Sequence, residues 1–410
     1  MQSLRELFKI GNGPSSSHTM GPKRATEIFK NKNLDADYFK VILYGSLALT
    51  GKGHLTDYII EKTLEGYKVD IEFNTEETCD VHPNTFDIFA YKNGEELNHW
   101  RVYSVGGGTF KIEGKKDIDR PEIYNETCFA DIKKVCEEKK YDLYEYVKSV
   151  EGDEIDEFLK EIWNSMQNTI KEGISKTGMI HGKLNLERRA KVIFDSFMPN
   201  EDVHLRQARL LSAYAYATNE ENACGGVIVT APTCGASGVL PSVLYYLKTE
   251  YGVSDEKIIK ALAVAGIIGN VVKKNASISG AECGCQAEVG TACSMAAAAA
   301  TYLAGMSIDK IENAAEIAME HHLGLTCDPI YGYVQIPCIE RNAVAAMRAL
   351  DATKLARITS KQRKISFDVV VETMYETGRD LQSHYRETSE GGLAKKYCRN
   401  KYYNRDMKEE

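Results

Sequence analysis

The chain has 410 residues, 43% of them apolar, which is enough to bury a substantial core and predicts two domains, or three at most. Its 51 basic and 59 acidic residues give a net charge of -8, and neither sign forms a long block, so a broad nucleic-acid-binding face is excluded. The longest apolar stretch, ALAVAGIIGNVV, is too short to cross a bilayer, and the N-terminal MQSLRELFKI lacks the apolar region of a signal peptide. We therefore expect a cytoplasmic protein with no membrane partner.

Short strand-like stretches alternate with turns up to about residue 140. Residues 39–49 (FKVILYGSLAL) and 67–74 (YKVDIEFN) have the composition of strands, and residues 84–97 contain an Asn-Gly hairpin signal. Residues 100–112 (WRVYSVGGGTFKI) predict a further strand region. These elements predict an N-terminal α+β domain.

From about residue 142 the apolar spacing becomes helical, and few strand-like stretches follow. The densest candidate core is GTACSMAAAAATYLAGM at 290–306, where alanine both favours a helix and lets neighbouring helices approach closely. We therefore expect a second, mostly all-α domain that carries the chemistry. Because no Pro/Gly-rich linker separates the two parts, we place the boundary between 140 and 155 and assign the domains to residues 1–145 and 146–410.

Residues 11–22 (GNGPSSSHTMGP) run three serines into a histidine and a threonine between two Gly-Pro pairs. Pro22 after Gly21 predicts a helix start, so the serines would precede a helix N-terminus. Free amides and hydroxyls at such a terminus suit a carboxylate or phosphate, and His18 beside them can act as a base. The alternative is an ordinary serine-rich capping loop, and the pattern alone leaves the two open.

Three further polar stretches lie in the N-terminal domain. In YGSLALTGKGHLTD at 44–57, the Gly-x-Gly-His spacing ahead of His54 suggests a backbone held close to another group. The stretch VHPNTFDIF at 81–89 reads as a turn into a strand. The glycine triplet at 106–108 is weak evidence for a phosphate-binding loop, since glycines also form ordinary tight turns.

Eleven cysteines in a cytoplasmic chain are more often buried thiols or metal ligands than disulfides. Cys285, Cys327 and Cys338 each lie beside Gly, Asp-Pro or Pro, where irregular backbone can aim a thiolate outward, and Cys283 could join them. Thiolates suit an iron-sulfur cluster or zinc, but the spacing matches neither a ferredoxin nor a paired zinc motif. A four-iron cluster held by three thiolates would leave one iron open as a Lewis acid.

Five stretches together closely resemble the bacterial iron-sulfur-dependent L-serine dehydratases, or L-serine ammonia-lyases: GPSSSHTMGP, YGSLALTGKGHLTD, TAPTCGASGVLP, NASISGAECGCQAEVGTACSMAA and HHLGLTCDPIYGYVQIPCIERNA. The resemblance spans both domains, with the beta-type part at 1–145 and the alpha-type, cluster-binding part at 146–410. It implies conversion of L-serine to pyruvate and ammonia by β-elimination with a [4Fe-4S] cluster and no pyridoxal phosphate. Members of this family are often homodimers.

The resemblance also assigns residues. It implies cluster ligands at Cys285, Cys327 and Cys338, and it offers Cys398 as a fourth when substrate is absent. The remaining assignments are His18, Ser17 and Thr19 as catalytic residues, with His18 as the base or its proton partner, and Ser16, His54, Asn275, Ser277, Ser279 and Gly280 as substrate contacts. The chain departs from the family at two cysteines. At the position of Cys234, relatives often carry an amide side chain. Many relatives end at a cysteine, whereas twelve more residues follow Cys398.

Three alternatives remain open at the level of sequence. A pyridoxal-phosphate dehydratase is supported by GGGTF and by Lys111, Lys115 and Lys116. A non-catalytic module would use the cysteines to hold structural zinc. The same machinery could also act on threonine, cysteine or another β-substituted amino acid, because small differences in pocket shape leave no motif.

Overall fold

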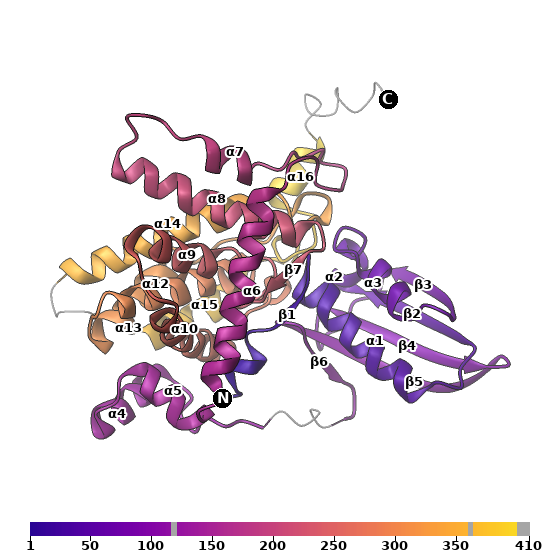
Figure 1. The fold of residues 1–410 in the computed structure, drawn as a ribbon. Helices are drawn as coiled ribbons and strands as arrows, with labels where there is room; N and C mark the ends of the chain where they lie inside the picture. Colours follow the sequence, from indigo (N-terminus) through magenta and orange to yellow (C-terminus); the bar gives the residue numbers. More distant parts are fainter. Residues whose placement is uncertain (116–120, 360–363, 400–410) are drawn as a thin grey trace.

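The computed structural model describes residues 1–115, 121–359 and 364–399, which form a sheet domain and a larger helical body (Figure 1). The sheet domain, residues 16–112, has strands in the order β3-β2-β4-β5-β6, with β2 and β3 parallel and the other neighbours antiparallel. Its strands are β2 (Tyr38–Tyr44), β3 (Lys68–Asn74), β4 (Thr85–Lys92), β5 (Glu95–Gly106) and β6 (Thr109–Ile112). Its helices are α1 (Gly21–Lys32), α2 (Gly45–Thr50) and α3 (Thr56–Thr63).

Alternating apolar residues give the sheet one buried face. In β2, Phe39, Val41 and Leu43 are fully buried and point to the side covered by the helices, where Phe29 of α1 joins their core. The predicted hairpin is confirmed, because Asn93 and Gly94 both have positive φ, at 52° and 86°, between β4 and β5. The predicted α+β character of this part is therefore confirmed.

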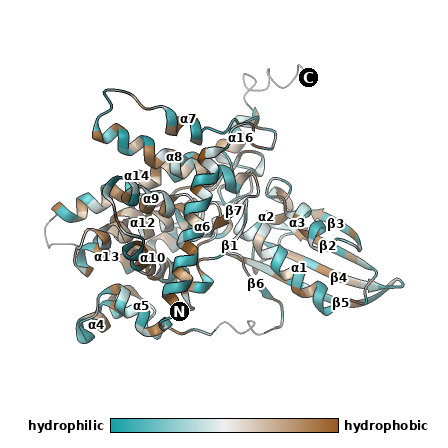
Figure 2. Cartoon of the chain, in the orientation of Figure 1, coloured by the Kyte–Doolittle hydropathy of each residue, from teal (hydrophilic) through white to brown (hydrophobic). Residues whose placement is uncertain are grey.

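The helical body surrounds one central helix. Its helices are α4 (Phe129–Lys139), α5 (Leu143–Glu151), α6 (Ile155–Ser175), α7 (Ala190–Asp195), α8 (Val203–Ala223), α9 (Val239–Tyr251), α10 (Asp255–Asn275), α11 (Gly280–Cys283), α12 (Thr291–Leu303), α13 (Ile308–Glu320), α14 (Cys338–Ile358), α15 (Phe367–Asp380) and α16 (Gly392–Arg399). Every residue of α12 from Thr291 to Thr301 is buried, and α9, α10, α13 and α14 pack around it. The predicted alanine-rich core is thus confirmed, while outer helices such as α1 and α6 alternate between hydrophilic and hydrophobic residues (Figure 2). In the parts of the chain described above, no helix combines the length and apolarity needed to span a membrane.

The first residues of the chain pack with the helical body and not with the sheet. Strand β1 (Ile10–Asn12) pairs antiparallel with β7 (Val227–Val229), and Leu4, Leu7 and Phe8 are buried in the larger core. The same core includes the apolar sides of α4 and α5. The boundary between the two hydrophobic cores therefore lies between Ile112 and Tyr124. This is earlier in the chain than residue 145, because α4 and α5 bury their apolar residues in the helical body.

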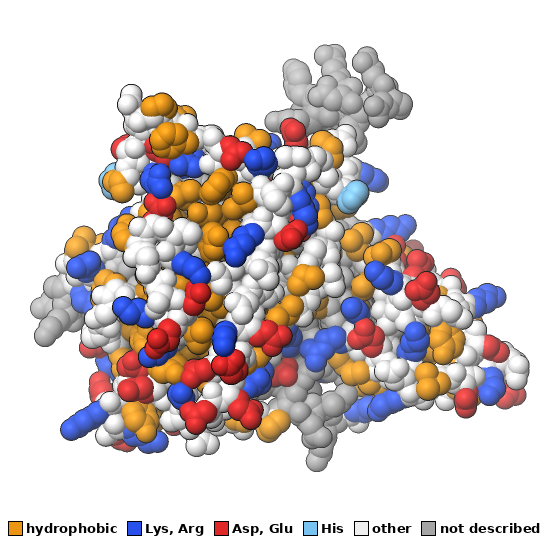
Figure 3. All heavy atoms as spheres, in the orientation of Figure 1, with side chains coloured by type: hydrophobic (Ala, Val, Ile, Leu, Met, Phe, Trp, Pro, Cys, Tyr) orange, Lys and Arg blue, Asp and Glu red, His pale blue; other side chains and the backbone are white. Residues whose placement is uncertain are grey.

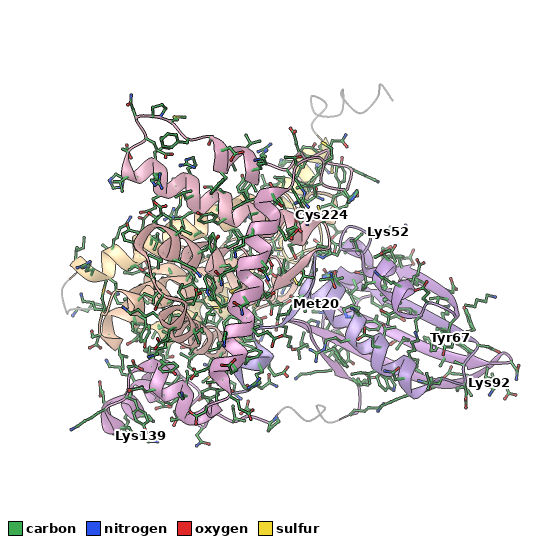
Figure 4. The ribbon with its side chains drawn as sticks, in the orientation of Figure 1. Met20, Lys52, Tyr67, Lys92, Lys139 and Cys224 are labelled. Atoms are coloured by element: carbon green, nitrogen blue, oxygen red, sulfur yellow. The ribbon has the colours of Figure 1, made fainter. Side chains whose placement is uncertain are left out.

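The junction of the two parts is built from small residues and Met20, which is labelled there in Figure 4. The glycines at 106–108 have φ values of 90°, 57° and 68°, and they turn β5 into β6 against Met20 and Ile278. Met20 in turn contacts Cys234, with a sulfur–sulfur distance of 3.4 Å. The glycine triplet is thus a tight turn at the junction, where a side chain at any of its positions would be strained.

Candidate active site

The serine run forms a helical turn that leads directly into α1. Residues Ser16–Met20 make one π-type turn, and the hydroxyl of Ser15 at its start accepts a hydrogen bond from the His18 amide at 3.1 Å. All of the side chains from Ser15 to Met20 are buried. The helix start predicted at Gly21 is therefore confirmed, since α1 begins there, and the serines before it form a helical turn of their own that Ser15 caps.

His18 is fully buried, and both of its ring nitrogens contact hydroxyl groups. Nδ1 lies 2.9 Å from Ser17 Oγ, while Nε2 lies 3.1 Å from Ser46 Oγ and 3.0 Å from Thr50 Oγ1. Burial, with a smaller effect from the neighbouring His54 ring, lowers the pKa of His18 to about 3. His18 is therefore a neutral imidazole near neutral pH, held in place by three hydroxyls.

His54 stacks on His18, with ring centroids 4.3 Å apart, and follows α2 in a short loop. Its Nδ1 lies 2.9 Å from the Thr50 carbonyl oxygen, and a carbonyl can only accept, so Nδ1 carries the proton. In the neutral ring, Nε2 then holds the free lone pair. Thr19, predicted as a catalytic residue, donates its hydroxyl to the His54 carbonyl at 2.7 Å and so fixes the loop.

The backbone before His54 lies against the helical body, as the Gly-x-Gly-His spacing predicts. A Cβ atom on Gly53 would stand 2.6 Å from the carbonyl carbon and oxygen of Gly332, which is closer than real Cβ contacts allow. The absence of a side chain at Gly53 thus lets the His54 loop reach a backbone segment that lies between Cys327 and Cys338.

Gly53→Ala is expected to separate these two backbones and to reduce the free energy of unfolding by about 1–3 kcal/mol, because neither backbone can move aside cheaply. Chemical denaturation measures the loss. The exposed neighbour Lys52→Ala is the matched control and is expected to unfold like the wild type. Equal stability of the two variants would mean that the contact is not needed for docking of the loop.

The three predicted cysteine ligands come from three separate elements of the helical body. Cys285 precedes the turn that leads into α12, Cys338 is the first residue of α14, and Cys327 lies in an extended segment between them. The Cys327 segment pairs through its backbone with residue Arg386, and its amide donates to the Tyr385 carbonyl at 2.8 Å. All three thiols are buried and line one small pocket.

A guanidinium group lies beside the thiols. Arg341 in α14 is anchored by hydrogen bonds to the Thr326 carbonyl at 2.6 Å and to Asp328 at 3.0 Å. A hydrogen bond with Cys327, together with this positive charge, lowers the pKa of the Cys285 thiol below its ordinary value. Burial raises the pKa of Cys338. The site therefore stabilises the thiolate form of Cys285. A bound cation would stabilise the thiolate forms of Cys327 and Cys338 as well.

Glu387 and Glu288 complete the pocket, and sequence reasoning missed both. Glu387 is 5% exposed, and its Oε1 lies 3.4 Å from His54 Nε2 and 3.9 Å from His18 Nδ1. Its φ of 57° is left-handed, which costs a non-glycine residue roughly 1–2 kcal/mol. Glu288 lies three residues after Cys285, and burial together with the nearby Glu387 carboxylate raises its pKa well above the ordinary range. An acidic residue within the polar run YRETSEGG was the one sequence signal for Glu387.

We call this space the thiol pocket, and it lies where the sheet domain meets the helical body. Its chemically active lining consists of Ser15, His54, Cys285, Glu288, Cys327, Cys338 and Glu387. The pocket region holds two groups of residues that could each bind a metal ion. One group is His18, His54 and Glu387, and the other is Cys285, Glu288 and Cys327. Within each group, the potential ligand atoms all lie within 4.8 Å of one another. The pocket thus brings histidine, carboxylate and thiol groups from both parts of the chain together.

Not every predicted residue reaches the thiol pocket. Gly280 does approach it, because a Cβ atom there would lie 3.1 Å from Cys327 Sγ. Ser279 precedes it, buried, with a hydroxyl that has no hydrogen-bond partner among the described residues. Asn275 is exposed at the end of α10 and donates to the carbonyls of Thr127 and Val271, while Ser277 donates to Glu282 in a separate cleft.

Two cysteines considered from sequence also lie elsewhere. Cys283 points toward α15, where a Cβ atom on Gly378 would be 2.8 Å from its sulfur. Cys398 is exposed on α16, beside Tyr331, and does not line the thiol pocket in this structure. Of the lysines considered for a pyridoxal-phosphate site, Lys115 lies over the Trp100 ring, 4.0 Å from its centroid, and Lys116 lies outside the described residues.

Comparison with known proteins agrees with this architecture. Residues 3–72 match the model of the serine dehydratase beta chain, and residues 76–394 match that of the serine dehydratase alpha chain. The chain is 40% identical to L-serine dehydratase 2 of Escherichia coli (strain K12) and to L-serine dehydratase of Haemophilus influenzae, in each case over 97% of this chain and 99% of the relative. It is 38% identical to L-serine dehydratase of Streptomyces coelicolor, over 96% of this chain and 98% of the relative. The chain therefore belongs to the serine dehydratase family, with the beta-chain and alpha-chain regions joined in one polypeptide.

Proposed function

We propose that this protein is an L-serine ammonia-lyase, which converts L-serine to pyruvate and ammonia. The observation that carries the proposal is the thiol pocket, in which three buried cysteines face a histidine with a free lone pair. It is supported by about 40% identity, over almost the whole chain, to proteins named L-serine dehydratase. The substrate is a small amino acid, which suits a small and enclosed pocket.

We infer that Cys285, Cys327 and Cys338 hold a [4Fe-4S] cluster, and that the enzyme uses no pyridoxal phosphate. The donor set fits the group, because thiolates are the usual ligands of iron-sulfur clusters and these three converge from separate elements. Gly280 supports the fit, since any side chain there would press on Cys327 Sγ. When bound through three thiolates, such a cluster supplies an open iron as a Lewis acid for the serine hydroxyl.

His54 is the proposed general base. Its Nε2 lines the thiol pocket and has no hydrogen-bond partner among the described residues, whereas both nitrogens of His18 are occupied by hydroxyls. This role differs from the sequence-based assignment of His18. His18 instead becomes the partner that supports the His54 ring from one face, and Ser17 and Thr19 support the two histidines in turn.

The residues then perform a β-elimination. His54 Nε2 takes the proton from Cα, the electron pair of that bond forms a Cα–Cβ double bond, and the Cβ–O bond breaks as hydroxide leaves with its electron pair. Ser15, which lines the pocket, and Ser16 beside it offer hydroxyls to the substrate carboxylate. The product 2-aminoacrylate tautomerises to an imine, and water hydrolyses the imine to pyruvate and ammonia.

We further propose that the protein is a cytoplasmic homodimer. All eleven cysteines are free thiols, which is the usual state in a reducing compartment. Figure 3 shows apolar side chains gathered near the α7–α8 end of the helical body. Large exposed apolar residues in this region are Val192, Phe197, Met198, Val203 and Leu205. Their contact with a second copy would remove this apolar surface from water.

The test is purification without oxygen, followed by analysis of iron, sulfide, zinc and absorbance, with an assay of pyruvate formed from L-serine. We expect about four irons per chain, a broad visible absorbance and pyruvate formation that decays in air as iron is lost. L-threonine and L-cysteine are assayed in parallel to fix the substrate. Iron-free protein with an aldimine absorbance band, or zinc-loaded protein without activity, would contradict the proposal.

A further inference from the structure

Glu387 is anchored more firmly than a loop residue needs to be. Its amide donates to the Cys327 carbonyl at 2.8 Å, and its own carbonyl accepts a hydrogen bond from Ser46 Oγ at 2.8 Å. The first contact belongs to the thiol side of the pocket and the second to the sheet domain. The backbone of Glu387 therefore joins the two halves of the site and fixes where its carboxylate lies.

One of the two oxygens of the Glu387 carboxylate lacks a hydrogen-bond donor among the described residues. Oε1 lies 3.4 Å from His54 Nε2, and the amide of Ala281 also faces the group, yet Oε2 is buried without a hydrogen-bond partner among the described residues. Burying an acceptor without a donor is costly, so such an atom in a pocket points to a ligand that donates to it. The missing donor must fit between the histidines and the thiols.

L-Serine presents three polar groups, and the pocket offers a different partner for each. Its carboxylate suits the hydroxyls of the serine run, and its hydroxyl suits the metal side formed by the cysteines. Its α-ammonium group has three N–H donors and one positive charge, so it requires an acceptor, best a carboxylate. Glu387 supplies that group at the position between the other two.

The position of Glu387 also agrees with the chemistry of the substrate. The ammonium nitrogen and the proton that is removed are both bonded to Cα, so the group that binds one must lie next to the group that takes the other. Glu387 Oε1 and His54 Nε2, at 3.4 Å, satisfy this requirement. Resting on the proposed function, we propose that Glu387 binds the α-ammonium group of L-serine and restricts the site to amino acids over the corresponding hydroxy acids.

Glu288 is the other acidic residue of the pocket and the main competitor for this role. It lies with Cys285 and Cys327, with the potential ligand atoms of all three within 4.8 Å of one another, so it belongs to the thiol side. Its carboxyl does not contact either histidine in the described structure. Glu387 is the carboxylate that lies beside the base, and the two residues can be separated by experiment.

The experiment measures binding of two ligands that cannot undergo elimination, L-alanine and L-lactate, by calorimetry on the anaerobically purified full chain. The ligands differ only in an ammonium or a hydroxyl group on Cα. Wild-type protein is expected to prefer L-alanine. Glu387→Gln is expected to weaken L-alanine binding by roughly 30-fold or more, as for a buried charge pair that loses one partner, and to leave L-lactate binding within about threefold. The KM for L-serine should rise by a similar factor.

Glu390→Gln is the matched control, because it removes an exposed carboxylate from the same segment, and it should bind both ligands like the wild type. Glu288→Gln is measured in parallel. If Glu387→Gln keeps the preference for L-alanine, or if Glu288→Gln alone loses it, the assignment to Glu387 is overturned. Should Glu387→Gln fail to fold, Glu387→Ala takes its place, because it also removes the carboxylate, and an unchanged preference for L-alanine in that variant has the same meaning.

These outcomes are distinct from failure of the proposed function. Wild-type protein that binds L-alanine over L-lactate but forms no pyruvate from L-serine would refute the lyase activity and leave the ammonium site intact. If the wild-type protein forms pyruvate but Glu387→Gln keeps the normal ligand preference, the ammonium site is refuted and the lyase activity stands. Melting temperature and iron content, compared across all variants, identify any loss caused by unfolding.

Discussion

His54→Ala is expected to lower kcat for L-serine by roughly 10²- to 10⁴-fold, the range typical for loss of a general base, while KM stays within a few fold. The reason is that Nε2 faces the pocket, 3.4 Å from Glu387 Oε1 and with no hydrogen bond among the described residues, while the Thr50 carbonyl holds the proton on Nδ1. This loss corresponds to about 3–5 kcal/mol of transition-state stabilisation. Steady-state kinetics under anaerobic conditions measures it, and iron content should equal that of the wild type.

Two companion variants make this result specific. His321→Ala removes an exposed histidine that does not line the pocket and should leave kcat unchanged. His18→Ala removes the ring stacked on His54 and should lower kcat less than His54→Ala does, because the base itself remains. A larger loss in His18→Ala than in His54→Ala would return the role of base to His18.

Cys327→Ala is expected to abolish both the bound iron and pyruvate formation. A three-thiolate site that loses one ligand can no longer hold a four-iron cluster, and the Cys327 segment also aligns Glu387 through its carbonyl. Iron and sulfide analysis, visible absorbance and the pyruvate assay give three independent measurements. We expect iron content close to that of a metal-free control and activity at background.

Cys283→Ala is the matched control for this prediction, because Cys283 is a similarly buried thiol, two residues before Cys285, that packs toward α15. It should retain iron and activity with at most a small loss of stability. Cys398→Ala should also retain iron, since Cys398 is exposed on α16. Iron retained by Cys327→Ala and lost from Cys283→Ala would move the metal site to a different set of thiols.

The sequence predicted those features that have a compact local signal. His54, Cys285 and Cys338 each directly follow a glycine or a proline, where the backbone turns, and a sequence motif shows such turns. Cys327 lies two residues before a proline, and His18 lies three residues before a glycine. The Asn-Gly hairpin and the alanine-rich core are likewise local patterns, and the structure confirms both. The two-part architecture followed from the change of apolar period.

Other features depend on contacts between distant segments and leave no local signal. Glu387 becomes part of the site only because its segment pairs with the Cys327 segment. Strand β1 is too short to be recognised until β7 lies beside it. Proximity in sequence can also mislead: Asn275 shares a motif with Gly280, which lies against Cys327, yet the side chain of Asn275 at the end of α10 donates to the carbonyls of Thr127 and Val271.

The late position of Glu387 in the chain has a consequence for biosynthesis. Domains fold as they emerge during translation, N-terminal parts first, so the sheet domain with both histidines can form early. The three thiols follow, but the segment that joins them to the histidines is the last part of the pocket to be translated. A nascent chain would therefore expose its thiols before the pocket closes over them, and the cofactor proposed above would have this interval in which to enter without opening a finished fold.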